Sequence, residues 1–268
     1  MVREAWPVAL AKGLRLAYYE GDLLLIGWLS TTAEAGYFLA SHKIILSLAV
    51  LVLLYQQNAF PALSRLVSTD AVRASQFQKN VSRYALLLSV PLAVGGAMTS
   101  RSVIQAVFGA GFERTSPIFA TMLFTLPLIV VTAGLHNQLL ARGHSTWFLT
   151  SVGVGAMVHL ALGVWWVREW SALGAARASL AAEVSTLCVA TYCVWTREKL
   201  SPLSWRVVPV VLSGCLMALL MYYFRDLPLL ERGLLGCLGY GLGVVGLGGV
   251  SSQELHFLQG FIKRQNVR

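Results

Sequence analysis

Eight apolar stretches alternate with polar gaps along the chain, and each is about long enough to cross the hydrocarbon core of a bilayer. A transmembrane helix needs roughly 20 predominantly apolar residues. The polar interval 64–82 is the longest gap and keeps scattered apolar residues, which is typical of a short helix at the membrane interface. The pattern predicts an all-α, polytopic membrane protein with spans over residues 7–29, 36–62, 83–107, 117–141, 146–167, 172–195, 207–224 and 230–250.

Basic residues are distributed unevenly over the gaps between these stretches. The N-terminus and alternate gaps, assigned to the cytoplasm, hold Arg3, Arg65, Arg73, Lys79, Arg83, Arg142, Arg197, Lys199, Arg206, Lys263, Arg264 and Arg268. The opposite side holds only Arg101, Arg114, Arg168, Arg177, Arg225 and Arg232. Cytoplasmic loops of membrane proteins carry an excess of Lys and Arg. The charge pattern therefore predicts a multi-pass protein of the cell inner (cytoplasmic) membrane, with both termini in the cytoplasm.

The composition agrees with a membrane protein. Hydrophobic residues make up 56% of the chain and charged residues 12%, with a mean hydropathy of +0.66. A soluble domain carries about 25% charged residues. The net charge of +9 resides in loops that flank the membrane, where attraction to anionic lipid explains it. We therefore expect membrane lipid as a partner, and no nucleic acid.

The sequence lacks the residue clusters on which enzymes depend. Acidic residues between the spans are scattered singly, and no GxSxG, HExxH or P-loop sequence occurs. The four cysteines fall inside predicted spans without CxxC or zinc-site spacing. A membrane enzyme would expose an acid, base or metal constellation at one surface. We therefore expect no enzymatic activity, no cofactor and no metal site.

Charged residues share one face of the first span. Lys12, Arg15, Tyr19 and Asp22 follow one another at i, i+3, i+7 and i+10, which places them on the same side of a helix. Charges at membrane depth normally face a bundle interior or a water-filled cavity. One interpretation is a hydrated cavity whose cations bind an anionic head group. The alternative is that Lys12 snorkels to the interface and Arg15 pairs with a carboxylate for structural reasons.

Two further charged residues lie within spans. Lys43 is near the outer third of the second span, where it could bind substrate or pair with Asp22 across the helix pair. Glu183 in the sixth span follows Arg177 by six residues, too far for a direct helical pair, so it needs another partner or a shifted protonation equilibrium. Asp22 and Glu183 are therefore candidates for ion coupling.

Four segments resemble polysaccharide flippases of the MOP superfamily. Glu34-Ala35-Gly36-Tyr37-Phe38-Leu39-Ala40-Ser41-His42-Lys43 resembles the "vGyYsaAyk" opening of a family helix, and Asn58-Ala59-Phe60-Pro61-Ala62-Leu63-Ser64-Arg65 resembles its "alfPrlsr" ending. The segment 107–112 resembles the "lfG..y" loop, and 173–178 resembles the "GavGAAla" helix start, although Arg177 replaces a small residue. Their order and spacing match the family across nearly the whole chain.

The resemblance implies a MOP/MATE-like second lobe. Family members have about twelve or fourteen helices in two pseudo-symmetric lobes that alternate access to a central site. This chain would correspond to helices seven to fourteen: a six-helix transmembrane lobe over residues 1–196, then two further C-terminal helices and a cytoplasmic tail over 197–268. The first span would border the central cavity. The chain would then be partial, or a separate chain would supply the first lobe.

The resemblance also implies a function. We expect flipping or export of lipid-linked oligosaccharide or polysaccharide precursors, with a lipid-linked (di)phosphate oligosaccharide bound by Lys12, Arg15, Tyr19 and Lys43. The alternatives are a multidrug or peptidoglycan-precursor transporter of the same superfamily, or a membrane subunit of a polysaccharide polymerase or glycosyltransferase. The polymerase or transferase alternative would need a large outer loop with clustered charges, which this sequence lacks.

Overall fold

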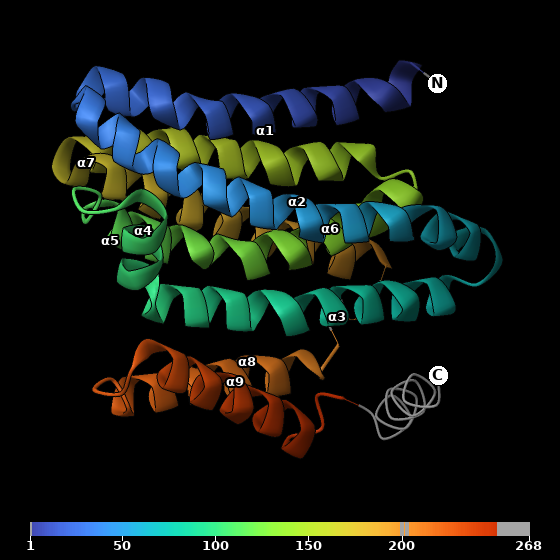
Figure 1. Ribbon diagram of the computed structural model, residues 1–268. Helices are drawn as coiled ribbons and strands as arrows, with labels where there is room; N and C mark the ends of the chain where they lie inside the picture. Colours follow the sequence, from blue (N-terminus) through green and yellow to red (C-terminus); the bar gives the residue numbers. More distant parts are fainter. Residues whose placement is uncertain (1, 199–200, 202–203, 251–268) are drawn as a thin grey trace, which may run out of the picture.

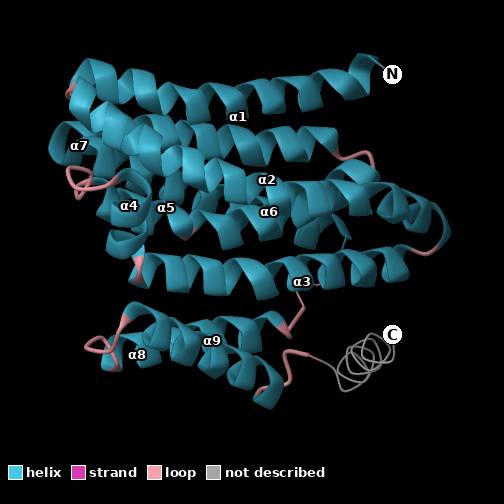
Figure 2. Cartoon of the chain, viewed as in Figure 1, coloured by secondary structure: helices cyan, strands magenta, loops and turns pink. Residues whose placement is uncertain are grey.

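The structure, a computed structural model, describes residues 2–198, 201 and 204–250. Within these ranges it contains helices and no strand, which confirms the all-α class (Figure 2). The helices are α1 (Val2–Leu29), α2 (Thr32–Thr69), α3 (Ala71–Met98), α4 (Ser100–Phe108), α5 (Thr115–Leu123), α6 (Thr125–Ala141), α7 (Ser145–Glu198), α8 (Val207–Tyr223) and α9 (Leu229–Gly246). Lys199 and the predicted cytoplasmic tail from 251 onward lie outside the described residues.

The long helices run roughly parallel to one another and form one bundle (Figure 1). α1 packs chiefly on α7, whereas α2 packs on α3, α5 and α6. α8 and α9 pack on each other and against α3, on the side of the bundle away from α1 (Figure 1). These two helices therefore contribute nothing to the space between α1, α2 and α7.

A sharp turn divides α7 into two antiparallel legs. Ser171 has φ 50° and ψ −130°, a non-helical conformation, and it separates a first leg (145–170) from a second leg (172–198). The Ser30 hydroxyl donates to that of Ser171 at 3.0 Å, which ties the turn to the end of α1. Gly174 lies against the backbone of Trp166, so only a residue without a side chain fits at this close approach. The two legs correspond to the predicted spans 146–167 and 172–195.

The predicted interfacial helix over 64–82 is wrong. α2 continues to Thr69 and α3 begins at Ala71, so this polar interval forms the projecting ends of two long helices. Asp70 alone interrupts them: its backbone N–H donates to the Leu66 carbonyl, and its carboxylate accepts from the N–H groups of Val72 and Arg73 at 3.0 Å. One capping residue ends the first helix and starts the next, which the apolar pattern did not reveal.

Apolar side chains cover much of the outside of the bundle. Large exposed residues include Leu24, Trp28, Tyr223 and Leu230, each more than three-quarters exposed. Five helices, counting α5 and α6 as one, are long and apolar enough to cross a membrane, and α8 is a shorter apolar helix. α1 is not among the five, since it contains Lys12, Arg15, Glu20 and Asp22. The chain is therefore a multi-pass membrane protein whose charged helix depends on its neighbours.

The arrangement of the helices predicts on which side of the membrane each loop lies. The end of α2 and the loop between α8 and α9 lie at opposite ends of the bundle (Figure 1). Reporter enzymes fused at Ser68 and Asp226 should therefore report opposite sides of the membrane, with Ser68 on the cytoplasmic side. Finding both reporters on one side would contradict the arrangement of the helices.

Candidate functional site

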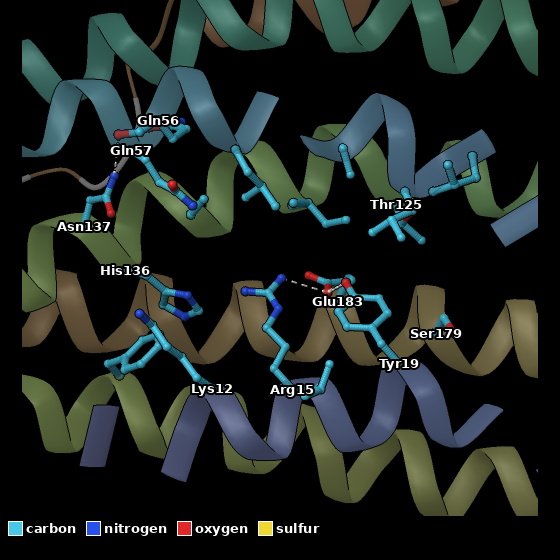
Figure 3. Close-up of a pocket in the computed structure, with 18 of the residues that line it drawn as sticks. Lys12, Arg15, Tyr19, Gln56, Gln57, Thr125, His136, Asn137, Ser179 and Glu183 are labelled. Carbon is cyan, nitrogen blue, oxygen red and sulfur yellow. Dashed lines mark hydrogen bonds and ion pairs between the residues drawn. The ribbon is translucent and has the colours of Figure 1, made fainter. Parts of the chain in front are cut away.

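A cavity of about 650 Å³ lies between α1, α2, α5, α6 and α7. Apolar atoms form most of the surface of its wall, and polar side chains from four of these helices project into it (Figure 3). Its polar lining residues are Lys12, Arg15, Tyr19, Glu20, His42, Gln56, Gln57, Thr125, His136, Asn137, Ser179 and Glu183. A cavity with a largely apolar surface and convergent polar groups is the usual form of a ligand site, so this cavity is the candidate site.

Arg15 and Glu183 form an ion pair in the wall of this cavity. The Nη2 atom of Arg15 lies 3.1 Å from Oε1 of Glu183, which is nearly fully buried, whereas the Arg15 side chain keeps 23% of its surface exposed. The same Oε1 also accepts from the hydroxyls of Tyr18 at 3.2 Å and Tyr19 at 2.6 Å. Oε2 has no partner among the described residues. Arg15 is thus the ion-pair partner of Glu183, which the sequence alone did not identify.

Three of the four predicted substrate-binding residues meet at the cavity. Lys12, Arg15 and Tyr19 project from the same side of α1, as their spacing predicted (Figure 3). Lys12 is exposed, so it can reach water in the cavity. The Arg15 guanidinium lies 5.8 Å from the centroid of the Tyr19 ring, within the range of a cation–π contact.

The fourth residue, Lys43, requires a correction. Its side chain is exposed and is not among the residues that line the cavity. The alternative pairing with Asp22 is also absent, because the carboxylate of Asp22 uses other partners. The neighbouring His42 takes the cavity-lining position instead, since adjacent residues on a helix point about 100° apart.

Asp22 lies in a second buried polar cluster between α1 and α7. Its Oδ1 lies 2.9 Å from Nε2 of His159, and its Oδ2 accepts from the Ser179 hydroxyl at 3.0 Å. Asp22, His159 and Ser179 are each less than 4% exposed. Tyr18 connects this cluster to Glu183, because its ring lies 5.0 Å from that of His159 while its hydroxyl donates to Glu183.

Amide and imidazole groups at the α6 side of the cavity have partners within the protein. Gln56 donates to the Val130 carbonyl at 3.1 Å, and Asn137 donates to the Gln56 carbonyl at 3.2 Å. His136 lies 2.9 Å from the hydroxyl of Ser151. These bonds hold α2, α6 and α7 together, so the three groups have a structural role.

Sequence reasoning missed Tyr18 and Ser179. Tyr18 is three residues after Arg15 and Ser179 is four residues before Glu183, so helical spacing alone places each beside a singled-out charge. The adjacent Tyr19 was predicted as a site residue because it shares a helix face with Lys12 and Asp22. The legs of α7 supply His159, Ser179 and Glu183 from far along the chain, which no local pattern indicates.

Comparison with known proteins supports the resemblance in sequence. Residues 1–117 match a family described as "Polysaccharide biosynthesis protein". A search of curated proteins gives no match. The family match covers the first span, the Gly36–Arg65 region and the loop at 107–112, where most of the quoted motifs lie.

Solved structures show the fold. The chain is similar to a lipid II flippase, MurJ, in an inward closed conformation, with a TM-score of 0.66, 15% identity and coverage of 94% of this chain and 52% of that one. It is also similar to a multidrug resistance MATE family transporter in an outward-facing conformation and to a MOP superfamily transporter from Pyrococcus furiosus. Both give a TM-score of 0.64, 17% identity and coverage of 91% of this chain and 63% of theirs. The fold is that of MOP superfamily transporters, and the chain spans between half and two-thirds of their length.

Proposed function

We propose that this chain is one lobe of a flippase-type exporter of lipid-linked oligosaccharide or polysaccharide precursors. The observation that carries the proposal is the cavity wall, where Lys12 and Arg15 project from one face of α1 in a fold of the MOP type. A diphosphate needs such cations, and the two residues suit different parts of it: arginine can contact phosphate oxygens bidentately, whereas lysine acts as a point charge. Tyr19 adds a hydroxyl and a ring at the same wall.

The transport step requires no covalent chemistry. The phosphate groups would be held by the cations while the sugar crosses in the hydrated cavity and the lipid tail stays in the bilayer. The protein would act in the cytoplasmic membrane with both termini in the cytoplasm. A precursor made in the cytoplasm would then load from the half of the membrane that contains Lys12 and Arg15.

A second lobe, from a separate chain or a longer form of this one, would complete the cavity. Leu16 and Leu46 line it yet are 64% and 50% exposed, which fits a wall that is open on that side. The solved relatives are longer than this chain, which covers 52% of the lipid II flippase. Asp22 and Glu183 are the candidates for ion coupling, because both are buried carboxylates between α1 and α7.

The alternative functions differ in what the cavity would bind. A peptidoglycan-precursor transporter would use the same phosphate chemistry with a different sugar. A multidrug transporter for cationic compounds would use carboxylates in the cavity wall, where Glu20 is exposed and the buried Glu183 is paired with Arg15. A polymerase or glycosyltransferase subunit would need an exposed catalytic cluster at one surface of the membrane.

Binding of a lipid diphosphate by the full chain in nanodiscs tests the proposal. Farnesyl diphosphate should bind and farnesol should not, because the cations recognise the phosphates. Lys12→Ala should weaken binding about tenfold, since hydrogen bonds to charged groups contribute about 1.5–3 kcal/mol. Lys43→Ala is the matched control and should bind like wild type. Equal binding of farnesol, or an effect of Lys43→Ala alone, would contradict the assignment of the anion site to this cavity.

A further inference from the structure

We propose that Glu183 couples the cavity to protons: an anionic head group and one proton bind together, because the phosphate takes Arg15 from Glu183 and Glu183 then accepts a proton. This inference rests on the proposed function, and it assigns the coupling step to one carboxylate. The proton is taken up from the bulk solution by way of water in the cavity, and it converts the carboxylate to a carboxylic acid. Release of the head group reverses both steps and restores the ion pair.

The geometry of the ion pair makes Arg15 available to a ligand. Only one of its nitrogens contacts Glu183, on a single oxygen, whereas a guanidinium has five N–H donors. The Arg15 side chain is 23% exposed and lines the cavity, while that of Glu183 is 1% exposed. A phosphate in the cavity can therefore approach Arg15 directly, while Glu183 stays behind it in the wall.

When Arg15 binds the phosphate instead, the charged carboxylate of Glu183 loses its ion-pair partner. A buried carboxylate that loses its ion-pair partner is strongly destabilised, and protonation removes that cost. The hydroxyls of Tyr18 and Tyr19 hold Oε1 in place. Oε2 is buried and has no partner among the described residues, so a proton there displaces no existing bond. The tyrosines therefore keep the group in position in both protonation states.

The other charged and titratable groups near this ion pair lie in environments that differ from that of Glu183. From α1, Lys12 and Glu20 line the cavity and are exposed, so water can stabilise their charges. From α2, His42 lies near Tyr19, with ring centroids 6.4 Å apart. His136 of α6 is bonded to Ser151, and His159 of α7 to Asp22. Within the described residues, Glu183 is the carboxylate in direct contact with Arg15.

Calorimetry on the full chain in nanodiscs measures the coupling. Farnesyl diphosphate is titrated at about pH 7 and about pH 8 in buffers of different ionisation enthalpy, which gives the protons taken up per ligand bound. Proton uptake by the ligand itself is common to all variants and cancels in the comparison. Wild type should take up about one more proton than Glu183→Gln. Glu183→Gln should bind about tenfold tighter at the higher pH, because its neutral amide no longer competes for Arg15.

Two further variants sharpen this comparison. Tyr18→Phe removes one hydrogen bond from the charged carboxylate without altering the cavity lining, so it should tighten binding in the same direction by a smaller factor. Glu34→Gln is the matched control: Glu34 pairs with Arg114 at 2.8 Å, and neither residue lines the cavity. This control should give the wild-type affinity and proton uptake.

The possible failures are distinguishable. If Glu183→Gln takes up as many protons as wild type, or binds more weakly, while Arg15→Ala loses binding, the coupling role is wrong and the anion site stands. If Arg15→Ala binds like wild type, the anion site itself is wrong. Inorganic diphosphate should bind more weakly than farnesyl diphosphate in every variant; equal affinity would overturn the assignment of the ligand to a lipid.

Discussion

Replacement of Arg15 by alanine is expected to abolish export, or to reduce it at least about a hundredfold, without loss of membrane insertion. The side chain faces the cavity and carries a charge in a setting of low dielectric, where contacts with phosphate are stronger than in water. Arg15→Lys should restore export only in part, because an ammonium cannot make the bidentate contacts of a guanidinium. Export is measured in cells that express this chain with a first lobe, at matched protein levels.

A double variant separates substrate binding from a structural role for Arg15. Arg15→Ala alone leaves Glu183 buried without its cation, which could by itself disturb the packing of α1 on α7. Arg15→Ala/Glu183→Gln removes both charges and keeps an acceptor for Tyr18 and Tyr19. If Arg15 binds substrate, the double variant also fails to export. Normal export by the double variant would show that Arg15 only neutralises Glu183, as the alternative interpretation of the first span proposed.

Gly174→Ala is expected to destabilise the protein by about 3 kcal/mol or more. Its added methyl group would overlap the backbone of Trp166 in the first leg of α7. Overpacking typically costs about 1–3 kcal/mol when side chains can adjust, and a backbone carbonyl cannot rotate away. The turn at Ser171 would therefore open, and the second leg would shift together with Ser179 and Glu183, which it supplies to the cavity.

Thermal unfolding in detergent measures this effect. Gly153→Ala is the matched control: it lies in the first leg of α7, and an added methyl group would meet nothing within 4 Å. Because alanine favours helix more than glycine does, this control should be as stable as wild type or slightly more stable. A Gly174→Ala protein with the unfolding temperature of the control would contradict the close approach of the two legs.

Local sequence patterns were sufficient for the helices and for one face of α1. Length and hydropathy located the apolar segments, because the bilayer fixes how many residues a span needs. The breaks at Asp70 and at Phe124, between α5 and α6, were not anticipated, because capping and local bending leave hydropathy unchanged. The spacing of Lys12, Arg15 and Tyr19 predicted their common side, since a helix repeats every 3.6 residues whatever packs against it.

The partners of the buried charges could not be predicted in this way. A pairing of Asp22 with Lys43 was one of two alternatives because both lie toward the same side of the membrane, but depth does not determine which way a helix is rotated. Glu183 meets Arg15 across 168 residues of sequence, because the turn at Ser171 returns the second leg of α7 to α1. Periodicity within one helix determined which residues share a face, while only the packing of α1 between the legs of α7 and α2 decided which charges that face contacts.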